Sequence, residues 1–163
     1  MKIRIAAAAV VITSLLLFFS IRFVNSVQED EWKIQRTAVL TAYEKTILTK
    51  VNKVERFVGE KPYTVIQGED KIGHKMIVWV GEDSLHTQMA SEGLAVENVE
   101  PLVLARQPGA EVLRSTPGIL NGMFVWEVFY NVSSEESGDD RYYYDYYNFK
   151  DGSHIDTYRL SIQ

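Results

Sequence analysis

Two runs rich in aromatic residues, 124–130 and 142–149, constrain the fold more than any other part of the chain. Tyr, Phe, Trp and Val favour strands, and the acidic segment 133–140 that separates the two runs is rich in turn-forming residues. A Lys-Asp-Gly turn follows at 150–152, and 154–160 again reads as a strand. The pattern predicts an antiparallel hairpin that continues into a third strand.

Side chains alternate between the two faces of a strand, so each run presents two sets of residues. In the first run, Trp126 lies on the face opposite Phe129. In the second run, Tyr143, Tyr147 and Phe149 oppose a set made of Tyr142, Tyr144 and Tyr146. Because neither face is purely polar, we expect the outer one to contact a partner; the alternative is that strand tyrosines simply keep their hydroxyl groups in water. The candidate partner-binding residues are Trp126, Phe129, Tyr143, Tyr147 and Phe149.

The N-terminal residues predict a membrane anchor. Residues 5–21 are uncharged, and Lys2 and Arg4 precede them. We expect a transmembrane helix over 5–24 with Arg22 snorkelling to the interface, residues 1–4 in the cytoplasm and the C-terminal domain extracellular. A cleaved signal peptide would begin in the same way, but no Ala-x-Ala site follows the apolar run, so the uncleaved single-pass anchor is favoured.

Composition excludes several classes of function. The chain has no cysteine, which excludes disulfides, cysteine-based zinc sites and a thiol nucleophile. Without Lys2, Arg4 and Arg22, 14 basic residues remain against 22 acidic ones, a net charge of −8. Such an acidic domain is poorly suited to nucleic acid, so proteins or neutral surfaces are the expected partners.

Beyond a linker at 25–30, the pattern of helix and strands occurs twice. A helix is expected over 31–50, its apolar face carrying Trp32, Ile34, Ala38, Val39, Ala42, Tyr43 and Ile47, with strands at 51–58, 63–67, 75–80 and 85–90. A second helix at 98–107 precedes strands at 111–116, 123–131, 141–149 and 154–160, with Pro117-Gly118 as a turn. We predict an α+β fold of two duplicated units, 31–91 and 92–163, each a helix plus an antiparallel sheet. Units this small bury little core alone, so the two are expected to pack together.

Catalytic and metal-binding patterns are weak. His74, His86 and His154 are isolated, and no Gly-x-Ser-x-Gly or Ser-x-x-Lys motif is present. Glu127 and Asp145 are the two acids that could act as a carboxylate pair, although a cross-strand arginine such as Arg141 or Arg159 would account for both. Segment 133–140 lacks the spacing of a calcium loop and is expected to be solvated. We therefore expect no catalytic residues, metal or cofactor.

The segments GMFVWEVFYN, RYYYDYYNFKDG and HIDTYRL, which follow the Pro108-Gly109 stop, resemble the PepSY domain. The whole chain resembles the TseB-like cell wall elongation regulators of Firmicutes, which are membrane-anchored proteins with two PepSY-like, cystatin-like units. The two aromatic segments are more specific for this family than the N-terminal unit is. The chain departs from the PepSY pattern at Ala95, where a serine cap is usual, and at Pro101. The second helix therefore either begins later, with Asn98 as its cap, or is kinked.

The resemblance implies a non-enzymatic regulator that acts outside the membrane on a class B penicillin-binding transpeptidase. An alternative is an inhibitor or chaperone of an extracellular protease, because PepSY units also occur in protease propeptides. A hydrolase or metal-dependent activity at the junction of the two units is the enzymatic alternative.

Overall fold

The computed structural model describes residues 14–16, 18, 30–133 and 140–161. The chain divides into two compact units, Met1–Ala38 and Val39–Gln163. In the first unit, all described residues are helical. Within the described part, no helix is both long and apolar enough to cross a membrane. The predicted anchor at 5–24 lies outside the described residues except for 14–16 and 18.

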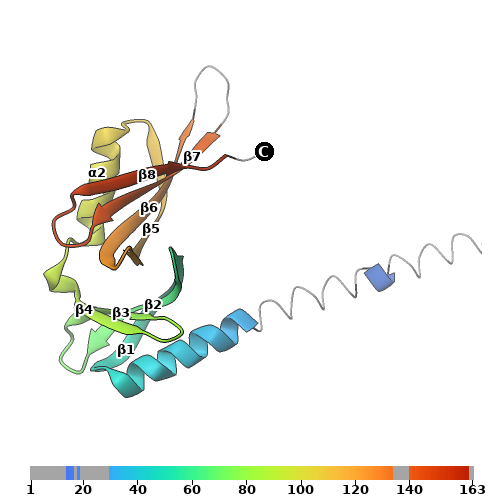
Figure 1. Cartoon of the computed structure of the whole chain (residues 1–163), viewed down its shortest axis with the longest axis vertical. Coiled ribbons are helices and arrows are strands. Elements are labelled where there is room, and N and C mark those ends of the chain that lie inside the picture. The colour runs from blue at the N-terminus through green and yellow to red at the C-terminus, as the bar shows by residue number, and fades with distance from the viewer. Residues whose placement is uncertain (1–13, 17, 19–29, 134–139, 162–163) are drawn as a thin grey trace, which may run out of the picture. The chain divides into compact units, whose positions relative to one another are not determined.

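The second unit contains two four-stranded antiparallel sheets, each a meander in which consecutive strands are neighbours (Figure 1). The N-terminal sheet consists of β1 (Leu48–Val58), β2 (Pro62–Asp70), β3 (Lys75–Val80) and β4 (Leu85–Met89). The C-terminal sheet consists of β5 (Ala110–Leu120), β6 (Met123–Ser133), β7 (Asp140–Asn148) and β8 (His154–Arg159). In the sequence, the segment between β4 and β5 forms the short 3₁₀ helix η1 (Ala90–Glu92) and the helix α2 (Val96–Arg106). The α+β class with antiparallel sheets is confirmed.

The prediction that Pro117-Gly118 forms a turn is wrong, because both residues lie inside β5. Proline is tolerated there because β5 is an edge strand of its sheet. The actual turn is Asn121-Gly122, where both residues have positive φ angles of 50° and 74°. An Asn-Gly pair with two positive φ values is the usual two-residue hairpin turn, and it joins β5 to β6.

The second helix begins earlier than the sequence indicated. Its N-cap is Ala95, which makes no side-chain capping hydrogen bond, and Pro101 lies inside the helix. The alternative with Asn98 as cap is therefore wrong: the Asn98 amide already donates to the Ala95 carbonyl at 2.9 Å. The helix ends at Arg106, just before Pro108-Gly109, as predicted.

The apolar face expected for the first helix is only partly buried. Residues 30–45 are helical, and Ala38 and Ala42 are buried, with Ala42 0% exposed. Tyr43 is exposed, as are Trp32, Ile34 and, just beyond the helix, Ile47. Large apolar residues occur around much of this helix, so periodicity alone did not identify the side on which the two alanines are buried.

One hydrophobic core extends across both sheets. Trp79 of β3 is fully buried; its ring centroid lies 4.9 Å from that of Phe124 and 6.1 Å from that of Phe149. Its indole N–H donates a 3.1 Å hydrogen bond to the carbonyl of Pro117. Phe57 of β1 lies against Gly118, where a Cβ atom would approach the phenyl ring to 2.2 Å. The expectation that the two sheets pack together is confirmed.

Candidate functional site

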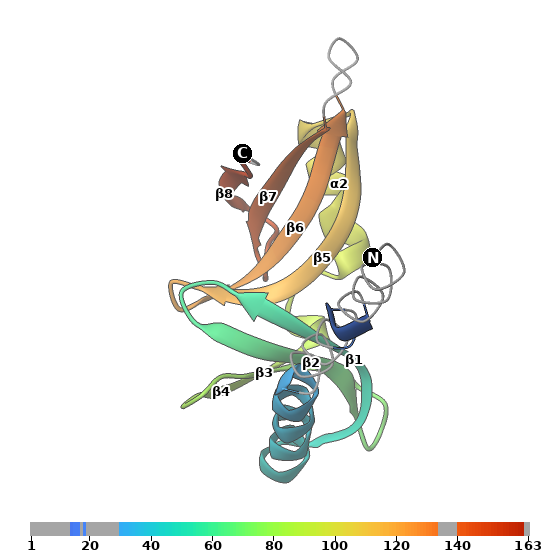
Figure 2. The ribbon, with the colours of Figure 1, turned by 90° about the vertical axis from the view of Figure 1, so that its right-hand side faces the viewer.

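The helix α2 covers one face of the C-terminal sheet (Figure 2). Figure 2 shows α2 running along one side of β5, β6 and β7. The register places Phe129 opposite Tyr144, and Tyr144 opposite Tyr158, on the side away from the buried helix-facing residues. Together with Tyr142, these three residues form what we call the open aromatic face.

The rings of the open aromatic face contact one another across the strands. Phe129 stacks on Tyr144 with a centroid distance of 4.7 Å and on Tyr142 at 5.8 Å. The Arg114 guanidinium lies over the Phe129 ring at 5.9 Å from its centroid, within the range of a cation–π contact. Tyr158 is 54% exposed, and the other three rings are partly exposed. The result is a rigid aromatic surface in which neighbouring rings fix each other's orientation.

A buried carboxylate lies beneath this face. Glu127 is 6% exposed, accepts a 2.9 Å hydrogen bond from the Tyr146 hydroxyl and pairs with Arg114 at 3.3 Å. Burial raises the pKa of Glu127 above its usual value, although the Tyr146 hydrogen bond and the charge of Arg114 favour the ionised form. Burial and the adjacent carboxylate also raise the pKa of Tyr146. These contacts hold Arg114 beside Phe129, so they position the edge of the aromatic face.

The second acid, Asp145, lies on the helix-covered side of the sheet and is 0% exposed. Its carboxylate pairs with Arg106 of α2 at 2.6 Å and accepts hydrogen bonds from the hydroxyl groups of Thr157 (2.6 Å), Tyr147 (2.9 Å) and Tyr130 (3.2 Å). Burial raises the pKa of Tyr147 to about 12. Three of these partners lie on other elements: Arg106 on α2, Thr157 on β8 and Tyr130 on β6. The carboxylate therefore connects β7 to its surroundings, and Asp145 is a structural group.

The five predicted partner-binding residues are divided between the core and the surface. Trp126, Tyr147 and Phe149 are at most 4% exposed. Trp126 donates to the Leu94 carbonyl at 2.9 Å and stacks on Phe149, which leaves neither ring free for a partner. Tyr143 is half-buried and stacks on Tyr130, on the side of the sheet that carries Asp145. Phe129 alone of the five belongs to the open aromatic face.

The candidate residues came from both faces of the predicted sheet, because alternation within a strand does not decide which face is buried. Opposite Phe129 stands Tyr144 and not Tyr143, so the neighbours of Phe129 are Tyr142 and Tyr144. Tyr158 was missed because its strand looked ordinary; its pairing with Tyr144 places it on this face. Each of the two acids does form an ion pair with an arginine. The pairs are Glu127 with Arg114 and Asp145 with Arg106, and not pairs with the expected Arg141 or Arg159.

Across residues 30–133 and 140–161, together with 14–16 and 18, no three His, Cys, Asp or Glu side chains gather into a group that could hold a metal ion. His74 pairs with Asp70 at 3.1 Å, and His154 contacts Thr157 at 2.9 Å. Glu127 and Asp145 lie on opposite faces of the sheet, each with its own arginine, so they do not form a facing pair of carboxylates.

Comparison with known proteins identifies relatives. Residues 37–81 match the model of the cell wall elongation regulator TseB-like domain. The probable cell wall elongation regulator TseB of Bacillus subtilis (strain 168) is 26% identical over 122 residues, which cover 70% of this chain and 73% of that protein. Among solved structures, the YpmB protein from Bacillus subtilis superposes with a TM-score of 0.64 at 25% identity, covering 77% of this chain and 96% of the other.

The resemblance to the TseB-like proteins is confirmed. The region of the match differs from our expectation, because the family model matches the N-terminal half and not the aromatic segments. This match covers β1, β2 and β3, which supply Phe57 and Trp79 to the shared core. The TseB-like match therefore coincides with most of the N-terminal sheet, whereas the open aromatic face lies on the C-terminal sheet. The PepSY part of the resemblance stays a prediction.

Proposed function

We propose that this chain is a membrane-anchored, extracytoplasmic regulator of cell wall elongation that binds a penicillin-binding transpeptidase through the open aromatic face. Its relative in Bacillus subtilis is described as a probable regulator of cell wall elongation, which supports the process. The observation that carries the binding role is the aromatic face itself. It places four rings on the face of the C-terminal sheet opposite the one that α2 covers (Figure 2).

The proposed contact energy comes from rigid aromatic rings. Tyr, Trp and Arg dominate the binding energy of protein interfaces because they bury much area at little cost in conformational entropy. Phe129, Tyr144 and Tyr142 are already held by mutual stacking, and Arg114 offers a charged group at the edge. Binding of a partner to this surface would therefore cost little additional side-chain conformational entropy.

The proposed anchor and topology rest on residues 5–24. This stretch carries no charge apart from Arg22, and basic residues precede it, as in a single-pass span with a cytoplasmic N-terminus. Leu15, Leu16 and Phe18 are helical and more than half exposed, which suits a lipid environment. An anchor would confine the protein to the membrane plane and so raise its effective concentration near a membrane-bound partner. The PepSY-like, cystatin-like character of the two sheets is part of the same proposal.

The test is in-cell crosslinking with a photoreactive residue at Tyr144, Tyr158 or Phe129 of the full chain. We expect capture of a penicillin-binding transpeptidase from these positions. The matched control is Ile72, a 68% exposed residue in the β2–β3 turn, from which the same partner should not be captured. Capture from Ile72 but not from the aromatic positions would overturn the choice of surface.

Two variants separate the roles of the face and the anchor. Tyr158→Ser removes an exposed ring and should weaken transpeptidase binding by about tenfold or more without changing folding, because hot-spot rings contribute at least about 2 kcal/mol. Replacing 5–24 by a cleavable signal sequence should preserve binding in vitro but reduce crosslinking in cells. Capture of a protease instead of a transpeptidase would identify the chain as a protease-binding protein.

A further inference from the structure

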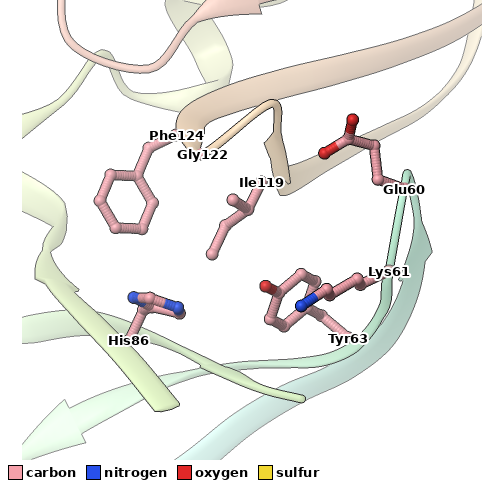
Figure 3. Close-up of a pocket in the computed structure, with 7 residues that line it drawn as sticks. All are labelled: Glu60, Lys61, Tyr63, His86, Ile119, Gly122 and Phe124. Atoms are coloured by element: carbon pink, nitrogen blue, oxygen red, sulfur yellow. The ribbon is translucent and has the colours of Figure 1, made fainter. Parts of the chain in front are cut away.

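A small pocket lies between the two sheets, apart from the open aromatic face. Its volume is about 280 Å³, near the lower end for small-molecule sites. Figure 3 shows Ile119 and Phe124 of the C-terminal sheet facing Tyr63 and His86 of the N-terminal sheet, with Glu60 and Lys61 beside them. The β5–β6 turn contributes Gly122.

Three rings and one aliphatic side chain form the apolar part of this pocket. The rings of Tyr63 and His86 meet edge to face at 6.2 Å, and those of His86 and Phe124 do so at 6.1 Å. Tyr63 and Ile119 are at most 8% exposed, so the core fixes their positions. The pocket therefore has preformed apolar walls that suit one aliphatic side chain.

Its polar groups have no partner within the protein. None of the hydrogen bonds or ion pairs found among the described residues uses the side chains of Glu60, Lys61, Tyr63 or His86. No buried side-chain polar atom of the described part lacks a partner, so the free Tyr63 hydroxyl must be accessible from the pocket or solvent. One carboxylate, one ammonium, one hydroxyl and one imidazole are thus free to bind a ligand.

The charges restrict the class of ligand. Lys61, with the hydroxyl of Tyr63, can bind a carboxylate, and Glu60 can bind an ammonium group. A phosphate or another multiply charged anion would be repelled by Glu60, and a dication would be repelled by Lys61. We propose that the inter-sheet pocket binds a short zwitterionic peptide of about dipeptide size, with its apolar side chain between Phe124 and Ile119. This inference is independent of the proposed transpeptidase contact.

The experiment is NMR titration of the full-length protein, kept in solution with detergent, using the dipeptide Ala-Leu with free termini as the probe. We expect saturable shifts of the Ile119 methyl signals and the Gly122 amide. Acetylating the dipeptide N-terminus, or amidating its C-terminus, should each weaken binding by about tenfold, the usual effect of losing one charge-assisted hydrogen bond.

Variants assign each charge to its end of the ligand. Glu60→Gln should weaken binding of Ala-Leu but not of its acetylated form, and Lys61→Met should weaken binding of Ala-Leu but not of its amide. Lys71→Met is the matched control, since Lys71 is an exposed lysine in the β2–β3 turn; it should bind as the wild type does. The proposal is overturned if Ile119 and Gly122 show no saturable shifts, or if Glu60→Gln and Lys61→Met leave the titration unchanged.

Discussion

At the residue scale, two acids on neighbouring strands have opposite surroundings. Asp145 is enclosed by an arginine, a threonine and two tyrosine hydroxyls on the helix-covered side of the sheet. Glu127 has one arginine and one tyrosine beneath the open aromatic face. A carboxylate with four donors is well compensated for its burial, whereas one with two donors is less so.

Replacing Asp145 should therefore be severe. Asp145→Ala leaves the Arg106 guanidinium and three hydroxyl groups without their common acceptor. Because the hydroxyl groups of Tyr130 and Tyr147 are buried, we expect a loss of about 3–5 kcal/mol in the free energy of unfolding. Urea denaturation of the purified protein measures it. Glu111→Ala, an exposed acid on β5, is the control and should change stability by less than about 0.5 kcal/mol. Equal losses in the two variants would contradict the structural role of Asp145.

Glu127 should make stability depend on pH in the direction set by its raised pKa. The folded protein holds the Glu127 proton more tightly than the unfolded chain, so the contribution of Glu127 to stability is greatest below the usual value of 4.5 and is lost as pH rises through the raised pKa. Glu127→Gln cannot titrate. The stability of the wild type minus that of Glu127→Gln should fall as pH rises from about 4 to 7. A difference that stays constant or increases over this range would show that burial does not determine the direction in which the pKa of Glu127 is shifted.

At the element scale, β5 carries the features that the sequence predicted as a turn. Pro117 presents a carbonyl group to Trp79, and Gly118 leaves room for the Phe57 ring. Both residues serve contacts with the other sheet, which explains why turn-forming residues occur inside a strand. The edge position of β5 makes this possible, because an edge strand pairs on one side only.

Adding one methyl group to β5 should test this contact. Gly118→Ala would place Cβ 2.2 Å from a Phe57 ring atom, and we expect a loss of about 1–3 kcal/mol from overpacking. Thermal denaturation followed by circular dichroism measures the change. Gly109→Ala is the matched control, since no heavy atom lies within 4 Å of its added Cβ. A Gly118→Ala protein as stable as Gly109→Ala would mean that Phe57 can move aside at little cost.

At the scale of the whole molecule, the shared core makes the two sheets depend on each other. Trp79 contributes both the indole hydrogen bond to Pro117 and the ring contacts to Phe124 and Phe149. Sheets joined in this way should unfold together, in contrast to two domains connected only by a linker.

Trp79→Phe should lower the stability of both sheets at once. The smaller ring leaves a cavity and deprives the buried Pro117 carbonyl of its donor, for an expected loss of about 2–4 kcal/mol. Calorimetry should show one transition in the wild type and one, at a lower temperature, in the variant. Two separate transitions in the wild type would contradict a shared core. An unchanged transition temperature in Trp79→Phe would mean that Trp79 contributes little to it.

The local sequence pattern was enough to predict most of the strands and helices. The strand at Lys75–Val80 was predicted with its observed bounds, and the hairpin of β6 and β7 with bounds within two residues, because aromatic and β-branched residues bounded by turn signals favour strands whatever surrounds them. The α+β class and the packing of two units followed from the repeated order of helix and strands and from their small size. The resemblance to the TseB-like proteins was also readable from the sequence.

Long-range contacts decided the rest. Whether Trp126 or Phe129 faces outward depends on which face of β6 the helix α2 covers, and which tyrosines adjoin Phe129 depends on the register of β6 with β7. The inter-sheet pocket combines Tyr63 and His86 with Phe124, which come from different sheets. A periodic sequence specifies that a strand has two unlike faces, but the assignment of each face to core or solvent is made by the packing of distant segments.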